Sequence, residues 1–134
     1  MKTLRLYTDG AARFNPGPAA VGVVIKDEQG NTVDELGRPI GTATNNVAEY
    51  RALIEGLKAA AKWKPDRLEI SLDSKLVVEQ IKGSYKVKKP ELKPLYDEAK
   101  KLLEGFAYEI EHVERESNSR ADELANLALD GHPT

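Results

Sequence analysis

The spacing of apolar residues near the N-terminus predicts three consecutive β-strands. Residues 4–9 alternate between apolar and polar side chains, which is typical of a strand with one buried face. Residues 20–25 form a β-branched run, residues 27–31 have the composition of a hairpin turn, and a third strand is expected at residues 32–37. Residues 11–18 contain the Asn15-Pro16-Gly17-Pro18 run and are expected to form a loop. The short connections favour an antiparallel meander.

The remaining chain changes to a helical period and then mixes helices with strands. Apolar residues at helical spacing predict a helix over about residues 46–63, which Pro65 closes. The expected elements that follow are a strand at 68–73, a short helix ending at Gly83, a helix from Pro90 to Gly105, a strand at 106–113 and a helix at 118–129. Trp63 is expected to be buried. The predicted order is βββαβααβα.

This order predicts the sheet before any site is considered. In a meander the first and third strands run in the same direction. Right-handed helical crossovers then make strands one, four and five parallel. We therefore expect an α/β fold with a five-stranded mixed sheet flanked by helices, and residues 1–134 as a single domain. Every strand end that leads into a helix lies at one edge of this sheet, where open α/β sheets bind ligands.

Four carboxylates are predicted to meet at that edge. Asp9 and Asp73 end strands, and Glu49 and Asp122 lie in the first turns of helices. Taken singly, each has a structural alternative in a turn or a helix cap: Asp9-Gly10, Asn46 with Glu49, Asp73 before Ser74, and Ser119 with Asp122. These alternatives do not explain the convergence, and clustered like charges need a cation. An all-oxygen ligand set predicts Mg²⁺ or Mn²⁺.

Composition narrows the class but does not name a substrate. The chain is 40% hydrophobic and 31% charged, as in globular proteins. It contains no apolar run of about 18 residues, which excludes a membrane span. There are no cysteines and no secretory signal, so a cytoplasmic location is expected. A monomer is expected because no apolar surface beyond one core is evident. The net charge of −2 gives no overall reason for nucleic-acid binding.

Five motifs in register resemble those of type 1 ribonuclease H, across nearly the whole chain. They are Tyr7-Thr8-Asp9-Gly10, Asn15-Pro16-Gly17-Pro18, Thr44-Asn45-Asn46 with Glu49, Leu72-Asp73-Ser74, and Asn118 with Ala121-Asp122 and Leu124-Ala125. The resemblance implies an endonuclease that hydrolyses the RNA strand of RNA–DNA hybrids. It also implies two Mg²⁺ ions held by the four carboxylates, with Mn²⁺ as a substitute, and products with 5′-phosphate and 3′-hydroxyl ends.

The same resemblance implies which residues contact the substrate. Asn45 and Asn46 match positions that contact the RNA sugar and bases, where the 2′-hydroxyl distinguishes RNA from DNA. For these two residues, turn and cap chemistry is the alternative. Thr44 matches a position that holds a DNA phosphate, and small residues after Asp9 would admit the backbone of the strand. The expected substrate contacts at this edge are Gly10, Ala11, Asn15, Thr44, Asn45, Asn46 and Ser74.

The chain departs from the family pattern at two places. A loop that carries a catalytic histidine in many members is short here, and His112 is expected inside or at the end of a strand. Arg115 is better placed for an electrostatic role, because arginine does not lose its proton at neutral pH. The basic helical handle of longer members is missing, and a lysine-rich segment with Lys86, Lys88 and Lys89 is the candidate replacement. An ordinary solvated loop is the alternative for that segment.

Two rival classes remain open on the sequence. A resolvase, integrase or transposase-type nuclease would share the fold, but it lacks the Asn45-Asn46 pair and usually carries further DNA-binding domains. A non-catalytic nucleic-acid-binding module would not need all four carboxylates. Cleavage of double-stranded RNA and the role of the tail from Asp130 onward are left undecided.

Overall fold

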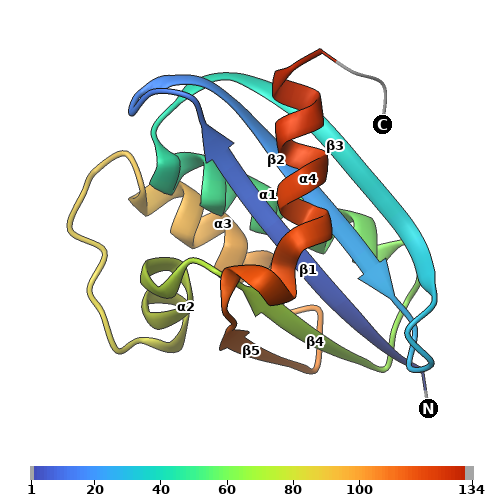
Figure 1. Cartoon of the computed structure of the whole chain (residues 1–134). Coiled ribbons are helices and arrows are strands. Elements are labelled where there is room, and N and C mark those ends of the chain that lie inside the picture. Colours follow the sequence, from blue (N-terminus) through green and yellow to red (C-terminus); the bar gives the residue numbers. More distant parts are fainter. Residues whose placement is uncertain (1, 132–134) are drawn as a thin grey trace.

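A single five-stranded sheet organises the chain in the computed structural model, which describes residues 2–131 (Figure 1). The strand order is β3-β2-β1-β4-β5, with β1 antiparallel to β2, β2 antiparallel to β3, and β1, β4 and β5 parallel. This is the predicted mixed sheet. The elements in chain order are β1 (Thr3–Ala12), β2 (Gly17–Lys26), β3 (Thr32–Ala43), α1 (Asn45–Ala61), β4 (Arg67–Leu72), α2 (Lys75–Lys82), α3 (Lys93–Leu103), β5 (Tyr108–His112), the 3₁₀ turn η1 (Arg115–Asn118) and α4 (Ser119–Leu129).

The first three strands are longer than predicted. The β1–β2 pairing continues to Ala12 opposite Ala19, so the loop expected at residues 11–18 is reduced to residues 13–16. Strand β3 runs on to Ala43, which pairs with Gly17. Pro39 interrupted the alternating pattern, but β3 is an edge strand, where a residue without an N–H is tolerated.

Two helix boundaries and one burial prediction also differ. Helix α1 ends at Ala61, so Trp63 lies beyond it, 36% exposed, with the Lys2 ammonium 5.7 Å from the centre of its ring. The prediction that Trp63 is buried was therefore wrong. Helix α3 begins at Lys93 and not at Pro90, with Pro94 in its first turn, where a proline is favoured.

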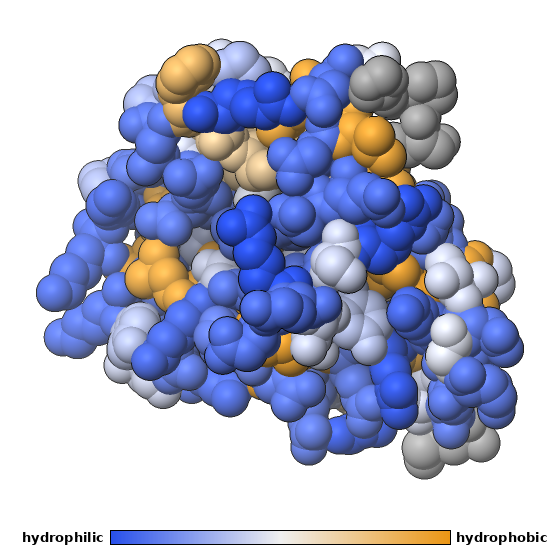
Figure 2. All heavy atoms as spheres, in the orientation of Figure 1, coloured by the Kyte–Doolittle hydropathy of each residue, from blue (hydrophilic) through white to orange (hydrophobic). Residues whose placement is uncertain are grey.

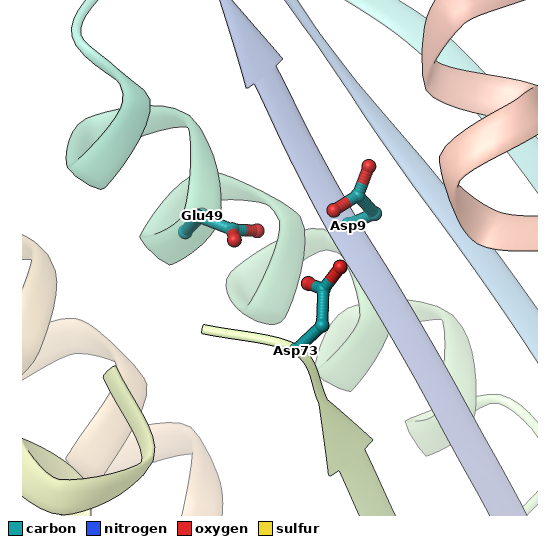
Figure 3. A group of neighbouring side chains, drawn as sticks. All are labelled: Asp9, Glu49 and Asp73. Carbon is teal, nitrogen blue, oxygen red and sulfur yellow. The ribbon is translucent and has the colours of Figure 1, made fainter. Parts of the chain in front are cut away.

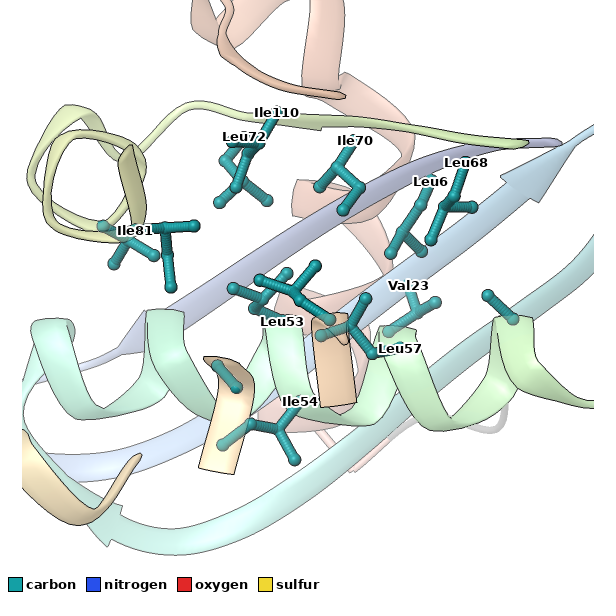
Figure 4. Packing of buried hydrophobic residues seen from close by; sticks show 14 of the residues in the cluster. Leu6, Val23, Leu53, Ile54, Leu57, Leu68, Ile70, Leu72, Ile81 and Ile110 are labelled. Carbon is teal, nitrogen blue, oxygen red and sulfur yellow. The ribbon is translucent and has the colours of Figure 1, made fainter. Parts of the chain in front are cut away.

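Helices pack on both faces of the sheet, and each face has its own cluster of buried apolar residues. The main core lies between the sheet and α1, where Leu6, Val23 and Ile70 face Leu53 and Leu57 (Figure 4). Helix α4 lies on the opposite face, in front of the sheet in Figure 1, and its Ala121 and Leu124 pack against Val24. Within residues 2–131, no helix has the length and apolar character needed to cross a membrane.

Glycines permit the closest helix–sheet contacts. A Cβ atom on Gly10 would lie 2.1 Å from the carbonyl carbon of Ala48 in α1. On the other face, a Cβ atom on Gly22 would lie 2.0 Å from the carbonyl oxygen of Ala121 in α4. Since Gly22 pairs with Asp9 across the sheet, these contacts set the distance of both helices from the same point on β1.

The replacement Gly22→Ala is expected to lower the free energy of unfolding by about 2–3 kcal/mol, because the backbone of α4 must move to admit the methyl group. Urea denaturation measures this change. The matched control is Gly105→Ala, whose Cβ would meet its nearest atom at an ordinary 3.4 Å. Equal stability of the two variants would contradict the close contact between α4 and β2.

Candidate active site

Three of the four predicted carboxylates come together at the expected edge of the sheet. One carboxylate oxygen each from Asp9, Glu49 and Asp73 lies within 4.8 Å of the other two (Figure 3). Asp73 directly follows β4, as predicted, but Asp9 lies inside β1 and not at its end. Glu49 is the fifth residue of α1 and so falls in its second turn, because the helix already begins at Asn45.

Asp122 borders the same site from the other face of the sheet. It lies in the first turn of α4, as predicted, and lines one cleft of about 490 Å³ with the other three carboxylates. The cleft is also lined by Gly10, Ala11, Ala12, Asn45, His112, Val113, Glu114, Arg115 and Asn126. A larger cleft of about 920 Å³ lies against β4 and β5, but none of the four carboxylates lines it.

The site carries negative charge that the protein only partly compensates. Burial, followed by the neighbouring carboxylates Glu49, Asp73 and Asp122, raises the pKa of Asp9 to about 9. Burial likewise raises the pKa of Glu49 to about 8, although the Gly10 N–H donates to its carboxylate at 2.7 Å and opposes the rise. One buried oxygen of Asp73, Oδ1, has no hydrogen-bond partner within residues 2–131.

These features fit a divalent cation. A cation among the oxygens would reverse the repulsion that raises both pKa values, and it would supply a partner for Asp73 Oδ1. Carboxylate oxygens without histidine or cysteine suit hard ions such as Mg²⁺ or Mn²⁺.

Two asparagines support Asp122 and the start of its helix: Asn118, which belongs to the fifth motif, and Asn126, which sequence reasoning did not single out. The Asn126 amide donates to the Asp122 carboxylate at 3.3 Å and to its backbone carbonyl at 2.9 Å. Asn118 is 1% exposed, and its amide donates to the Thr8 carbonyl at 2.8 Å, which ties the start of α4 to β1 beside Asp9. The four-residue spacing of Asp122 and Asn126 on one helix face was a readable signal.

Arg115 is the cation nearest to this part of the site. Its guanidinium donates to the Asp122 carboxylate at 3.2 Å, and this hydrogen bond raises the pKa of Arg115. His112 is the last residue of β5, as expected, and it also borders the cleft.

Hydrogen bonds link the predicted substrate residues near the last residue of β1 to those at the first turn of α1. The Asn45 N–H donates to the Asn15 side chain at 3.0 Å, and the Ala12 N–H donates to the Asn45 side chain at 3.3 Å. Thr44, and not Asn46, caps α1 by accepting from the Val47 N–H at 3.2 Å. Asn45 therefore lines the cleft with Gly10 and Ala11, whereas Asn46, the next residue of α1, is not among the lining residues.

Two other predicted substrate positions differ in their placement. Ser74, and not Asp73, caps α2 by accepting from the Val77 N–H at 3.3 Å. Lys86, Lys88 and Lys89 are exposed on the segment between α2 and α3 and do not line the cleft. The tail, whose role the sequence left undecided, lies largely at residues 132–134, outside the described residues, although Asp130 forms an ion pair with Arg13.

Comparison with known proteins gives one consistent assignment. The family model described as reverse transcriptase-like matches residues 7–128. Ribonuclease HI of Halobacterium salinarum is 50% identical over 92% of this chain and 63% of that protein. The crystal structure of RNase H1 from Halobacterium salinarum NRC-1 has a TM-score of 0.94 at 48% identity, covering 96% of this chain and 98% of the other. LC11-RNase H1, solved in complex with an RNA/DNA hybrid, has a TM-score of 0.91 at 44% identity, covering 96% and 97%.

Fold and site together define an α/β protein with an acidic centre that could hold a metal ion at the edge of a mixed sheet. The chain belongs to the ribonuclease H family, which confirms the resemblance carried by its five motifs. It spans between 35% and 63% of the length of the curated mycobacterial and archaeal relatives that it matches.

The raised pKa of Asp9 predicts how the metal-free protein responds to pH. Because the folded state holds this proton more tightly than the unfolded state, unfolding free energy should fall as pH rises from the ordinary carboxyl pKa of 3.8 towards about 9. Asp9→Asn puts a neutral side chain at this position without the proton uptake that Asp9 needs on folding, and it should raise the unfolding free energy at pH 8 by about 1–3 kcal/mol.

Thermal or urea unfolding in a chelator, at pH 5 and pH 8, measures both effects. Adding Mg²⁺ at pH 8 should stabilise the wild-type chain and leave Asp9→Asn nearly unchanged. A wild-type stability that is the same at both pH values, with and without Mg²⁺, would contradict the charge repulsion described above.

Proposed function

We propose that this protein is a ribonuclease H that cuts the RNA strand of RNA–DNA hybrids by two-metal-ion catalysis. The observation that carries the proposal is the meeting of Asp9, Glu49 and Asp73 within 4.8 Å at the sheet edge. The likeness to RNase H1 structures adds support, since one of them, LC11-RNase H1, was solved with an RNA/DNA hybrid. The products would carry 5′-phosphate and 3′-hydroxyl ends.

The carboxylates have distinct places in this proposal. Asp9, Glu49 and Asp73 would hold two Mg²⁺ ions, and Asp122 would complete the second position from α4. When bound, such ions activate the attacking water and stabilise charge on the leaving oxygen. The Gly10 N–H holds the Glu49 carboxylate, and Asn126 holds that of Asp122, so both are oriented before substrate arrives. Mn²⁺ offers the same oxygen-ligand chemistry and would substitute.

Arg115 would act on the substrate phosphate by charge alone. Its ion pair with Asp122 holds the guanidinium at the cleft wall, 75% exposed and free to turn toward an incoming phosphate. A guanidinium stays protonated at neutral pH, so it can stabilise negative charge or assist product release but cannot shuttle the proton.

Selection of RNA would take place at the joined ends of β1 and α1. The links from Asn15 to Asn45 and from Asn45 to Ala12 hold this corner in place. The Asn45 and Asn46 amides can both donate to and accept from a ribose 2′-hydroxyl and the base edges. Gly10 and Ala11 would leave room for the strand. Thr44 and Ser74 each cap a helix, and in this proposal Thr44 would also help to hold a DNA phosphate and Ser74 would contact the substrate.

The other sequence predictions are carried forward on narrower grounds. Figure 2 shows a largely hydrophilic face around α4, with hydrophobic residues in small groups. This face therefore offers no large apolar patch for a second copy of the chain, which supports the prediction of a monomer. Cytoplasmic location and additional cleavage of double-stranded RNA stay predictions.

Replacing Asp73 by Asn should abolish cleavage of the RNA strand, by about a thousandfold or more, because a charged ligand oxygen becomes a neutral amide. The assay uses end-labelled RNA as an RNA–DNA hybrid, as double-stranded RNA and as a single strand, with Mg²⁺, Mn²⁺ or a chelator. Hybrid binding, measured by fluorescence anisotropy, should be largely retained. The control is Asp97→Asn, an exposed acid of α3 remote from the cleft. Cleavage that survives Asp73→Asn would refute the assignment, and no cleavage by the wild-type chain would favour a non-catalytic binding module.

The exposed lysines after α2 should contribute a salt-dependent part of hybrid affinity. Replacing Lys86, Lys88 and Lys89 together by Ala should flatten the slope of log Kd against log salt by about 2–3, because phosphate contacts release counterions. The matched control replaces Lys62, Lys64 and Lys101, which are also exposed but lie elsewhere. Identical slopes for the two triple variants would show that the segment is an ordinary solvated loop.

A further inference from the structure

Two consecutive hydrogen bonds join α1 to α2 and α2 to the segment that follows it. The Tyr50 hydroxyl donates to the Gln80 side-chain oxygen at 2.6 Å, and the Gln80 amide donates to the backbone carbonyl of Lys86 at 3.2 Å. Tyr50 is 0% exposed and Gln80 is 3% exposed. Burying a glutamine is costly unless its polar atoms are paired, and here both ends of the amide are paired.

Of the helices joined by these hydrogen bonds, α1 carries Glu49, and α2 begins two residues after Asp73. Tyr50 directly follows Glu49 on α1. Gln80 lies on α2, whose N-cap Ser74 directly follows Asp73. The two hydrogen bonds therefore relate the position of the Lys86 backbone to α1, which holds Glu49, and to α2, which follows Asp73 in the chain.

The segment between α2 and α3, residues 83–92, is fixed at several points and yet displays its charges. Gly83 ends α2 in the left-handed conformation, and the Ser84 N–H donates back to the Glu79 carbonyl at 2.9 Å. Val87 packs against the main core and Leu92 is 2% exposed, so both side chains anchor the segment to the core. Lys86, Lys88 and Lys89 are left exposed along it.

We propose that Gln80 is a positioning residue for nucleic-acid binding, which holds the lysine-bearing segment 83–92 at a fixed place relative to α1 and α2, the helices next to the site. The inference rests on the proposed function, because it takes the ligand of the lysines to be the phosphate backbone of the hybrid. A flexible segment would lose conformational freedom whenever its lysines bound phosphates, and the Gln80 bond to Lys86 removes part of that cost before binding. Gln80 touches neither the cleft nor the exposed lysine side chains, so it would act only through the backbone of Lys86.

The test compares three variants of the full chain. Gln80→Met keeps the side-chain length and removes both hydrogen bonds. Tyr50→Phe removes only the bond between α1 and α2. Val77→Ala removes buried apolar volume from the same helix and no polar contact, so it controls for loss of stability. Amide hydrogen exchange of residues 84–92 reports on the segment without any nucleic acid, and anisotropy with a labelled RNA–DNA hybrid in a chelator gives Kd and its salt slope.

For Gln80→Met we expect segment amides to exchange at least about tenfold faster, hybrid Kd to rise about three- to tenfold, and the salt slope to flatten by about 1. Tyr50→Phe should give smaller changes of the same sign, and Val77→Ala should leave the slope at its wild-type value. Faster exchange in Gln80→Met with an unchanged Kd and an unchanged salt slope would overturn the positioning role of Gln80 and leave the proposed function intact. Absence of hybrid binding by the wild-type chain would overturn the proposed function and this inference together. This outcome is distinct from the previous one because it is seen with the wild-type chain alone.

Discussion

Mutual repulsion among buried carboxylates is the constraint on which the rest of this structure depends. Asp9, Glu49 and Asp73 place oxygens within 4.8 Å of one another, and burial followed by the neighbouring carboxylates raises the pKa values of Asp9 and Glu49. The fold holds them there because each sits on an element anchored by apolar packing elsewhere: Leu6 on β1, Leu53 on α1 and Ile70 on β4. The site is thus unfavourable by itself and is held together by the core.

Tight contacts on both faces of β1 convert that core into a defined geometry. On one face, the absence of a side chain at Gly10 lets α1 approach until the Gly10 N–H reaches Glu49. On the other face, Asn118 ties α4 to the Thr8 carbonyl and so brings Asp122 beside Asp9. Both contacts converge on three consecutive residues of one strand, which explains how segments far apart in sequence deliver their charges to one place.

The sequence predicted the order of elements and the meeting of the carboxylates because both follow from hydrophobic period and chain direction. It could not place element ends, since these depend on partners: β1 runs past Asp9 because β2 continues to pair with it, and Glu49 moves to the second turn because Thr44 caps the helix. The burial of Trp63 was predicted wrongly because the helix was expected to reach residue 63. Helix α1 ends at Ala61, which leaves Trp63 outside the core. Buried pairs such as Tyr50 and Gln80 join positions that no local pattern relates.

A chain of net charge −2 can serve as a nucleic-acid enzyme only if its charges are separated in space. The acids of the cleft would be neutralised by the cations that they bind, so they need not repel a phosphate strand once those ions are present. The lysines after α2 lie outside the cleft, where they cannot form ion pairs with its carboxylates. Holding that segment in place through Gln80 keeps the two regions apart. In the proposed function, this separation would let the acids bind metal ions while the bases bind a polyanion.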